Sequence, residues 1–284
     1  MTPFTFTGGV AVVTGAASGI GRALATDLAR RGSHLALIDR DEAGLTLVAD
    51  GLRVRHPHLR VTTHPFDLTL TDGIPDLADA VLRAHRRVTL LINNAGVALG
   101  GSFLEITLEE FEWVQSVNFR GVVAMCRAFL PALRSELHPH VVNVSSLYGL
   151  IGPVGQSAYA ASKFAVRGFS EVLRHELAPV GIGVTVVHPG GVRTNIANNA
   201  RVGSGVRAST RDAEAEREVM NRLLRLPPAD AARVILRGVE RRSPRVIVGN
   251  DARALDLLAR ILPGTYWTVL SRLLPGRPGG GNRS

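Results

Sequence analysis

Residues 10–21 read VAVVTGAASGIG, a run of β-branched and small apolar residues that leads into a glycine-rich turn. The apolar run predicts a buried strand, and the apolar period after the turn predicts a helix over residues 20–32. Gly15, Gly19 and Gly21 allow a tight turn and a close approach of the backbone to a pyrophosphate group, while the helix N-terminus supplies N–H donors. The spacing is G-x-x-x-G-x-G instead of the common G-x-G-x-x-G, so the stretch needs support from other motifs before it indicates a dinucleotide site.

Strand-like and helix-like segments alternate along the rest of the chain. Continuous apolar runs, typical of buried parallel strands, are separated by segments of helical period. The pattern predicts an α/β protein of the Rossmann type: a doubly wound sheet of about seven parallel strands with helices on both faces. The predicted strands cover residues 10–15, 34–40, 61–66, 88–94, 140–146, 183–189 and 245–249, and the clearest helices cover residues 20–32, 108–134 and 157–177.

Composition limits the class of protein and its compartment. The chain has 284 residues, 45% of them apolar and 20% charged, as expected of a globular protein. The single cysteine, Cys126, excludes an internal disulfide and agrees with a reducing compartment. The opening residues, MTPFTFTGGV, do not resemble a signal peptide, and no uncharged apolar run reaches the ~18 residues of a membrane span. We therefore expect a cytoplasmic protein.

The net charge of +9 is concentrated in the C-terminal third. Residues 201–284 contain 16 Arg and 8 acidic residues, a net of +8, which leaves +1 for residues 1–200. A solvated basic surface is the simplest interpretation, and contact with an anionic membrane surface or an acidic ligand is the alternative. No nucleic-acid-binding motif accompanies the charge, and none of the nine histidines has metal-ligand spacing. We expect neither a nucleic-acid partner nor a metal.

A second motif, YAASKFAV at residues 159–166, contains Lys163, the only lysine among the 33 basic residues that are Lys or Arg. Tyr159 and Lys163 are four residues apart on a predicted helix, so they share one face. Ser146 lies thirteen residues before Tyr159, at the C-terminal end of a predicted strand, where parallel sheets bind their ligands. A Y-x-x-x-K pair is common by chance. Its combination with the serine and the glycine-rich turn predicts a hydroxyl, a phenol and an ammonium beside a nucleotide.

Together these segments resemble the ordered motif set of the short-chain dehydrogenase/reductases. The motifs are TGAASGIG (14–21), NNAG (93–96), Asn118, NVSS (143–146), Tyr159-x-x-x-Lys163 and PGGVRT (189–194). The resemblance covers about residues 8–195 by motif and extends to about 250 by the order of strands and helices. It implies an enzyme of the single-domain branch, using NAD or NADP. It also implies a homodimer or homotetramer built on the helices over 108–134 and 157–177.

The resemblance implies a role for each catalytic position. Tyr159 would be the general acid in reduction and the general base in oxidation. The neighbouring ammonium of Lys163 would lower the pKa of its phenol, ~10 when free, and bind the nicotinamide ribose. Ser146 would bind the substrate oxygen, and Asn118 would hold a water molecule in a proton relay. Ser145 competes with Ser146, and the thirteen-residue gap to Tyr159 favours Ser146.

Asp39 is the main indicator of cofactor preference. It ends the second predicted strand, 24 residues after Gly15, where an acid can accept a hydrogen bond from an adenosine ribose 2′-hydroxyl. Capping of the next helix is the alternative role, and Arg40 offers a cation to a 2′-phosphate. We predict NAD over NADP. The full set of implied cofactor contacts is Gly15, Ser18, Gly19, Ile20, Gly21, Asp39, Asp67, Leu68, Asn93, Ala95, Gly96, Tyr159, Lys163, Pro189, Gly190, Val192 and Thr194, and His188 beside the last group is expected to be a packed strand-end residue.

Substrate identity is only weakly indicated. Residues 191–226 are expected to form a mobile lid, and REVMNRLLRL (217–226) offers apolar side chains to a pocket, as does Tyr148 beside Ser146; ordinary packing is the alternative. We expect an apolar secondary alcohol or ketone that binds Ser146, Tyr148 and Tyr159. A dinucleotide sensor without catalysis, and a dehydratase or epimerase that uses bound dinucleotide, are the other functions. The apolar lid positions are Val219, Leu223, Leu224 and Leu226.

The chain is expected to divide into a catalytic domain, 1–250, and an amphipathic C-terminal extension with a basic tail, 251–284. The leucine-rich stretch within 252–277 is broken by Pro263 and Gly264, so it cannot span a bilayer. Its apolar residues are expected to cover a neighbouring subunit or the substrate pocket. The alternative is peripheral membrane contact, with Tyr266 and Trp267 at the headgroups. The last residues, RPGGGNRS, are expected to be disordered.

Overall fold

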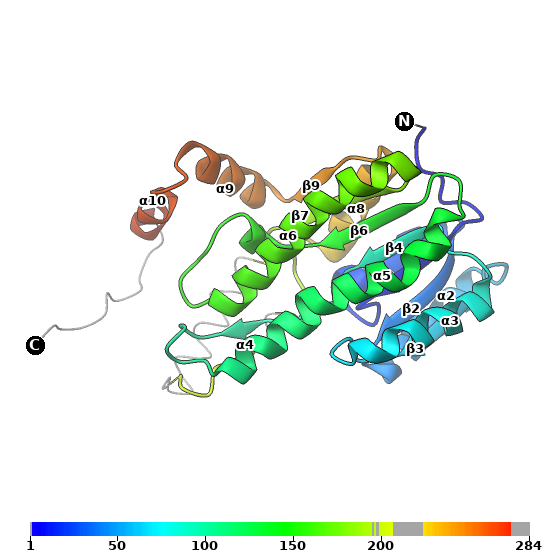
Figure 1. The fold of residues 1–284 in the computed structure, drawn as a ribbon, viewed down its shortest axis with the longest axis horizontal. Coiled ribbons are helices and arrows are strands. Elements are labelled where there is room, and N and C mark those ends of the chain that lie inside the picture. The colour runs from blue at the N-terminus through cyan, green and yellow to red at the C-terminus, as the bar shows by residue number, and fades with distance from the viewer. Residues whose placement is uncertain (1, 195, 197–198, 207–223, 274–284) are drawn as a thin grey trace, which may run out of the picture.

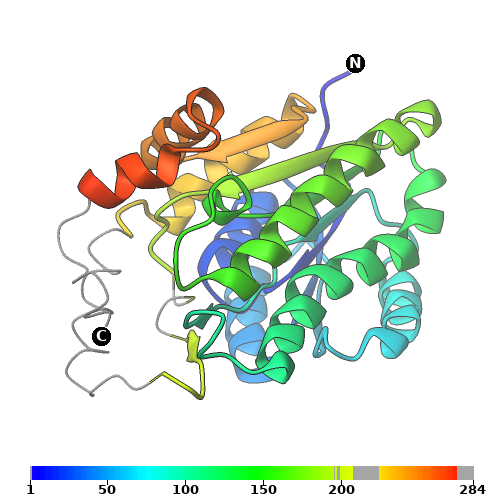
Figure 2. The same ribbon diagram turned by 60° about the vertical axis from the view of Figure 1, so that its left-hand side comes forward.

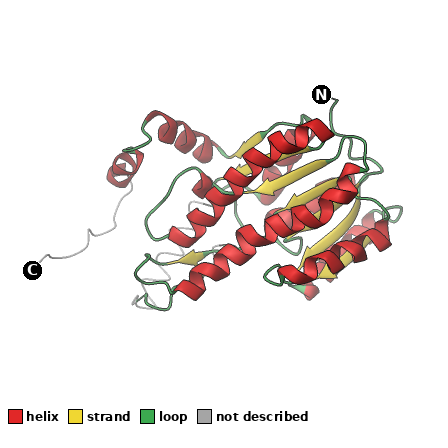
Figure 3. Cartoon of the chain, in the orientation of Figure 1, coloured by secondary structure: helices red, strands yellow, loops and turns green. Residues whose placement is uncertain are grey.

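Seven strands form one parallel sheet in the computed structural model, which describes residues 2–194, 196, 199–206 and 224–273. Each strand lies inside the range predicted for it, so the predicted fold is confirmed (Figure 3). The strand order is β3-β2-β1-β4-β6-β7-β9, and every neighbouring pair is parallel. The strands are β1 (Val10–Thr14), β2 (His34–Asp39), β3 (Val61–Pro65), β4 (Leu90–Asn93), β6 (His140–Val144), β7 (Gly183–Pro189) and β9 (Arg245–Val248).

Helices cover both faces of this sheet, and each face has its own apolar core. Leu28, Leu52 and Ile235 belong to the core on one face, and Val81, Phe129 and Val166 to the core on the other. Figure 1 shows α5 and α6 crossing the near face, with α8 behind the sheet. The first core is built by α1 (Gly19–Arg30), α2 (Glu42–Arg55) and α8 (Pro228–Glu240), and the second by α3 (Ile74–His85), α5 (Gly121–Arg134) and α6 (Ser157–Leu177).

The prediction of one regular α-helix over 108–134 is wrong in one respect, because a π-helical turn interrupts it. The structure has α4 (Leu108–Gln115), one π-helical turn (Ser116–Arg120) and then α5. A capping box between Thr107 and Glu110 begins α4. The π turn contains Asn118, which is buried. Its side-chain amide accepts a hydrogen bond from the N–H of Val97 and donates one to the C=O of Val97. Such turns widen a helix locally, and apolar periodicity does not predict them.

The C-terminal extension folds back onto the body of the protein. It contains α9 (Asn250–Ile261) and α10 (Tyr266–Leu273), seen at the upper left of Figure 2. Ala252, Tyr266 and Leu270 pack against Leu147 and Ile151, directly after the candidate serine. This packing places the extension on the segment that follows Ser146, and its role as a cover of the substrate pocket stays a prediction. Contact of the extension with a membrane or a neighbouring subunit stays a prediction. The boundary between a catalytic domain, 1–250, and the extension, 251–284, also stays a prediction.

Along the described part of the chain, no helix combines the length and the hydropathy needed to cross a bilayer. The predicted disorder of residues 277–284 falls outside the described residues.

Candidate active site

The predicted site residues gather where the parallel strands end. Gly15 follows β1, Asp39 ends β2, Ser146 lies two residues beyond β6, and Pro189 ends β7. Because all of these strands run in one direction, their carboxyl ends meet at one edge of the sheet, where ligands of this architecture bind. The helix α6 brings Tyr159 and Lys163 to the same edge, because Lys163 Nζ reaches the carbonyl of Val144 at the end of β6.

The glycine-rich turn is built so that only glycine fits at its critical positions. Gly15 and Gly19 have φ angles of 67° and 53°, in the left-handed region. A Cβ atom on Gly21 would lie 2.0 Å from the carbonyl oxygen of Gly15, and one on Gly15 would lie 2.9 Å from Cα of Ala95. Any side chain at these positions would collide with the protein's own backbone, and the resulting tight turn at the N-terminus of α1 is the cradle predicted for a pyrophosphate.

Asp39 lies beside this turn and does not cap a helix. Its Oδ2 accepts a hydrogen bond from the N–H of Ala17 at 3.0 Å, and its Oδ1 accepts one from the N–H of Asp41 at 3.1 Å. Asp41 itself caps α2, because its carboxylate accepts from the N–H of Gly44 at 2.9 Å. The capping role considered for Asp39 is therefore wrong, and its carboxylate is placed next to the cradle.

Two residues that hold the turn were missed by sequence reasoning. Thr14 Oγ1 accepts from the N–H groups of Asn94 and Ala95 at 2.9 and 3.0 Å. Asn94 Nδ2 donates to the carbonyl of Thr14 at 3.0 Å. These bonds join the turn after β1 to the loop after β4. Both residues lie inside the quoted motifs, TGAASGIG and NNAG, which could have indicated them.

Asn93, predicted as a cofactor contact, has a different environment. Its side chain is 2% exposed, and its Nδ2 donates to Asn143 Oδ1 at 2.8 Å inside the layer between the sheet and α5. Any contact from Asn93 to a cofactor would have to come from its backbone. Of the other predicted contacts on this side, Asp67 accepts from the N–H and hydroxyl of Thr69 at 2.9 Å each, and Leu68 is buried.

Ser146, Tyr159 and Lys163 form one cluster, in which Tyr159 and Lys163 are buried and Ser146 is half-buried. Ser146 Oγ accepts from the N–H of Tyr148 at 3.1 Å and also hydrogen-bonds the Tyr159 side chain. Lys163 Nζ lies 5.7 Å from the centre of the Tyr159 ring. Ser145, in contrast, donates to the carbonyl of Lys163 at 2.7 Å and is buried. The geometry thus gives Ser145 a structural role and leaves Ser146 beside the phenol.

The pKa of the Tyr159 phenol is shifted in the opposite direction from the one expected. Burial raises the pKa of Tyr159 to about 12; the hydrogen bond from Ser146 opposes this shift and Tyr148 adds to it. Burial also lowers the pKa of Lys163 to about 8. The expectation that Lys163 lowers the phenol pKa is not met here. Desolvation disfavours both charged forms, and the ammonium donates to Val144 instead of the phenol oxygen.

Asn118 connects the π turn to this cluster. Its Nδ2 donates to the carbonyl of Val97 and to Ser162 Oγ, both at 3.0 Å, while its Oδ1 accepts from the N–H of Val97 at 2.8 Å. A Cβ atom on Gly96 would lie 3.3 Å from both Asn118 Oδ1 and Lys163 Nζ, so these three residues adjoin one another. Both N–H donors of the Asn118 side chain are thus bonded to protein atoms. The role of Asn118 in holding a water molecule stays a prediction.

The loop after β7 faces the glycine-rich turn. A Cβ atom on Gly19 would lie 3.1 Å from the methyl group of Thr194, so the two loops adjoin. The N–H of Gly190 donates to Val248, and the N–H of Gly191 donates to the carboxylate of Asp251 at 2.6 Å. Asp251 lies in the first turn of α9, and sequence reasoning missed this contact with the predicted nicotinamide loop.

His188 is packed, as predicted, and it also supports the serine. It is fully buried, and its Nδ1 donates to the backbone carbonyl of Ser146 at 3.0 Å. Burial lowers its pKa to about 4, so it is neutral at physiological pH. A neutral, buried imidazole with a bond to the backbone is a positioning group, not an acid or base of the reaction.

The predicted lid is partly anchored. Its described residues 199–206 include β8 (Arg201–Val202), which pairs in parallel with β5 (Leu99–Gly100). Arg201 stacks over Trp113 at 3.8 Å. At the far end, Leu226 pairs with Val192. The apolar positions Val219 and Leu223 fall outside the described residues. Tyr148, the other predicted lining residue, places its ring 5.9 Å from that of Tyr159.

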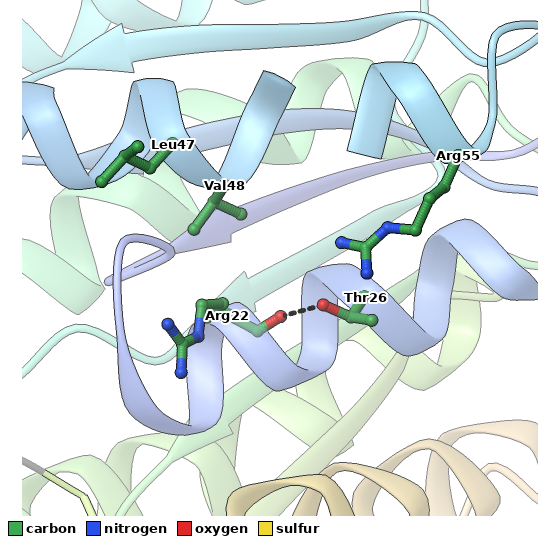
Figure 4. A pocket seen from close by; sticks show the side chains of 5 residues that line it. All are labelled: Arg22, Thr26, Leu47, Val48 and Arg55. Atoms are coloured by element: carbon green, nitrogen blue, oxygen red, sulfur yellow. Dashed lines mark hydrogen bonds between the residues drawn. The ribbon is translucent and has the colours of Figure 1, made fainter. Parts of the chain in front are cut away.

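A groove of about 330 Å³ lies near the turn, between α1 and α2 (Figure 4). None of the predicted catalytic residues lines it; its walls come from Arg22, Thr26, Leu47, Val48 and Arg55. Arg22 follows Gly19 by three residues on α1, so it is a second cation, besides Arg40, that is close in sequence to a residue of the cradle. Within the described residues, no group of three or more His, Cys, Asp or Glu side chains could hold a metal ion.

Known proteins resemble this chain over most of its length. A family model described as short chain dehydrogenase matches residues 9–204. A Mycobacterium tuberculosis protein named as an oxidoreductase, SadH, is 42% identical over 271 residues, covering 94% of this chain and 95% of its own. A short-chain dehydrogenase/reductase from Burkholderia phymatum in complex with NAD has a TM-score of 0.82 at 32% identity, covering 98% of this chain and 99% of its own.

A metagenomic short-chain oxidoreductase in complex with NADP has a TM-score of 0.69 at 30% identity, covering 86% of this chain and 98% of its own. The matched spans include both the glycine-rich turn and residues 146–163. The chain therefore belongs to the short-chain dehydrogenase/reductase family of oxidoreductases.

Proposed function

We propose that this protein transfers a hydride between NAD(H) and an apolar secondary alcohol or ketone. The observation that carries this proposal is the buried cluster in which the Tyr159 phenol is hydrogen-bonded by Ser146 and lies beside Lys163. A phenol held against a hydroxyl at the carboxyl edge of the sheet suits proton transfer to a substrate oxygen bound by both. Tyr148, beside the phenol, would supply an apolar wall to the substrate.

The residues around the turn fit a nicotinamide dinucleotide. Gly15 and Gly21 allow a tight turn whose N–H groups would bind a pyrophosphate, and the Asp39 carboxylate beside it suits a ribose hydroxyl. The loop with Thr194 would face the nicotinamide. A bound nicotinamide supplies or accepts the hydride. These residues would therefore contact both ends of one extended ligand.

In reduction, Tyr159 would donate its phenolic proton to the substrate oxygen as negative charge develops there, and Ser146 would hold that oxygen. The high pKa of Tyr159 keeps the proton in place before the reaction. In oxidation, Tyr159 would remove the hydroxyl proton, which needs a lower phenol pKa than burial alone produces. Lys163, whose own pKa is lowered to about 8, supplies a positive charge near the ring when protonated.

The proposed preference for NAD rests on Asp39, which would repel a 2′-phosphate. Arg22 and Arg40 would attract a 2′-phosphate and so favour NADP. Of the two related structures, one is in complex with NAD and the other with NADP. Titration with NADH and NADPH separates these possibilities: we expect tighter binding of NADH. Comparable or tighter binding of NADPH would reject the preference without affecting the proposed reaction class.

The experiment that tests the function follows the absorbance of reduced dinucleotide against a panel of alcohols and ketones, with wild type and Tyr159→Phe. We expect turnover of an apolar substrate by wild type and a loss of about 100-fold or more in Tyr159→Phe, with cofactor binding retained. Binding of dinucleotide without turnover of any panel member would favour the alternative, a dinucleotide sensor. The predicted cytoplasmic location stays a prediction.

A further inference from the structure

A basic groove of about 630 Å³ lies at the opposite edge of the sheet from the candidate active site. It is formed where β1 and β2 begin, before β3, and at the end of α3. In a parallel sheet this is the amino edge, so the groove and the glycine-rich turn are separated by the length of the strands. The groove is lined by Val10, His34, His58, Arg60, Arg83, His85 and Arg86.

The three arginines of this groove carry uncompensated charge. Arg87, next in the chain, pairs with Glu136, whereas Arg60, Arg83 and Arg86 have no carboxylate partner among the described residues. The guanidinium of Arg60 is held in place by a hydrogen bond to the carbonyl of Ala84. Three guanidinium groups around one groove repel one another, and this repulsion disfavours the folded state.

Arg86 adds a second unfavourable feature. It terminates α3 with φ 65° and ψ −18°, a left-handed conformation in which glycine is preferred. Arg242 also has a positive φ, 52°, but its guanidinium donates to the carbonyls of His138, Pro139 and Gly181. Within the described residues no such bond accounts for the guanidinium of Arg86. Charge repulsion and backbone strain thus coincide at one groove, as they do at binding sites.

The histidines add hydrogen-bond donors to the arginines. His34 Nδ1 accepts from the backbone N–H of Arg60 at 2.9 Å, so Nε2 carries the proton of the neutral ring and is a donor. His85 shares the hydroxyl of Thr62 with His64, each at 2.8 Å. Burial, then His64, Arg60 and His34, lower the pKa of His85 to about 4, which is consistent with a positive potential in the groove.

We propose that this groove binds the phosphate group of a small phosphorylated molecule. Guanidinium groups bind phosphate oxygens through paired, charge-assisted hydrogen bonds, and three of them would neutralise its charge. The volume, several times that of one phosphate, leaves room for the rest of the ligand. Binding there would relieve the repulsion among the arginines and stabilise the folded protein.

Isothermal titration with inorganic pyrophosphate tests this site, using protein saturated with NADH so that the glycine-rich turn is occupied. Wild type is expected to bind one pyrophosphate. The variant Arg83→Gln/Arg86→Gln should bind it about tenfold or more weakly, because two charge-assisted bonds are lost. The matched control is Arg237→Gln/Arg241→Gln, which removes two exposed arginines at the C-terminal end of α8 and should leave affinity unchanged.

A third variant, Arg86→Gly, separates ligand binding from stability. Glycine suits the left-handed position, so the Tm should rise while pyrophosphate affinity falls. Absence of binding by wild type at about 10 mM pyrophosphate would overturn the proposal, because no useful affinity would remain. Equal affinity in the Arg83/Arg86 and control variants would overturn it too, and a lower Tm for Arg86→Gly would remove the argument from backbone strain.

Discussion

Lys163 is held in an environment that disfavours its charge, and the protein's stability should show it. Burial lowers its pKa from 10.5 to about 8, so between pH 8 and 10.5 the unfolded chain binds more protons than the folded chain at this site. The contribution of Lys163 to the free energy of unfolding should therefore become more favourable as pH rises through this window. Below pH 8 both states are charged, and the full desolvation cost remains.

Urea unfolding of wild type and Lys163→Met at several pH values measures this effect. The stability of the variant relative to wild type should decrease from pH 8 to 10.5, because the penalty in wild type disappears. Tyr159 acts in the opposite sense only above pH 10, where its raised pKa makes the folded chain the stronger proton binder. A difference that stays constant from pH 7 to 10 would contradict a lowered Lys163 pKa.

The same site predicts that arginine cannot replace its lysine, although the chain has 32 arginines. Lys163 is 3% exposed, and its compact ammonium reaches Val144 from beside the Tyr159 ring. A planar guanidinium has a different reach and stays charged, so it would be buried at greater cost. Lys163→Arg should lose about 100-fold or more in kcat/KM. Near-normal turnover of this variant, measured with Tyr159→Phe as the inactive reference, would refute this account.

At the scale of elements, α9 is tied to the loop that follows β7. Asp251 accepts from the N–H of Gly191 at 2.6 Å, across 60 residues of sequence. We expect Asp251→Ala to raise the KM for the dinucleotide about five- to tenfold, since a charge-assisted bond that orders the loop is lost. Asp251→Asn keeps an acceptor oxygen and should recover part of the affinity.

Steady-state kinetics with varied concentrations of reduced dinucleotide check this prediction. Arg253→Gln is the control, because Arg253 is exposed on the same helix. If Asp251→Ala and Arg253→Gln have the same KM as wild type, α9 does not order the loop. The comparison also distinguishes a local effect from general destabilisation, because a global loss of folding would lower kcat and Tm together.

For the whole molecule, the outer face of α6 predicts self-association. Phe164 and Val172 are 41% and 56% exposed on this helix, and a Cβ atom on Gly168 would meet nothing within 4 Å. An exposed apolar face with room for a neighbouring helix suits the predicted dimer or tetramer on α4–α5 and α6. Gly168→Arg should reduce the mass measured by light scattering, and Ala43→Arg on α2 should not. A wild-type monomer at micromolar concentrations would be incompatible with this interface.

Much of this protein is encoded in local sequence patterns. Apolar runs with short polar ends predict all seven strands, because burial of both sheet faces requires continuous apolar residues. The helix over 157–177 is predicted to the residue, and the spacing of Tyr159 and Lys163 places both on one face. Glycine at position 15 follows from its left-handed φ of 67°, and glycine at position 21 from its close approach to the carbonyl of Gly15. These features depend on neighbours in the chain.

Other features arise only in the folded molecule. Asn93 and Asn94 are adjacent, yet one side chain is buried under α5 and the other holds the glycine-rich turn. The bonds from His188 to Ser146 and from Asp251 to Gly191 span 42 and 60 residues. The high pKa of Tyr159 reflects how completely packing removes water from it. Local periodicity determines which residues are buried, whereas side-chain contacts and desolvation depend on segments that meet only when the sheet is assembled.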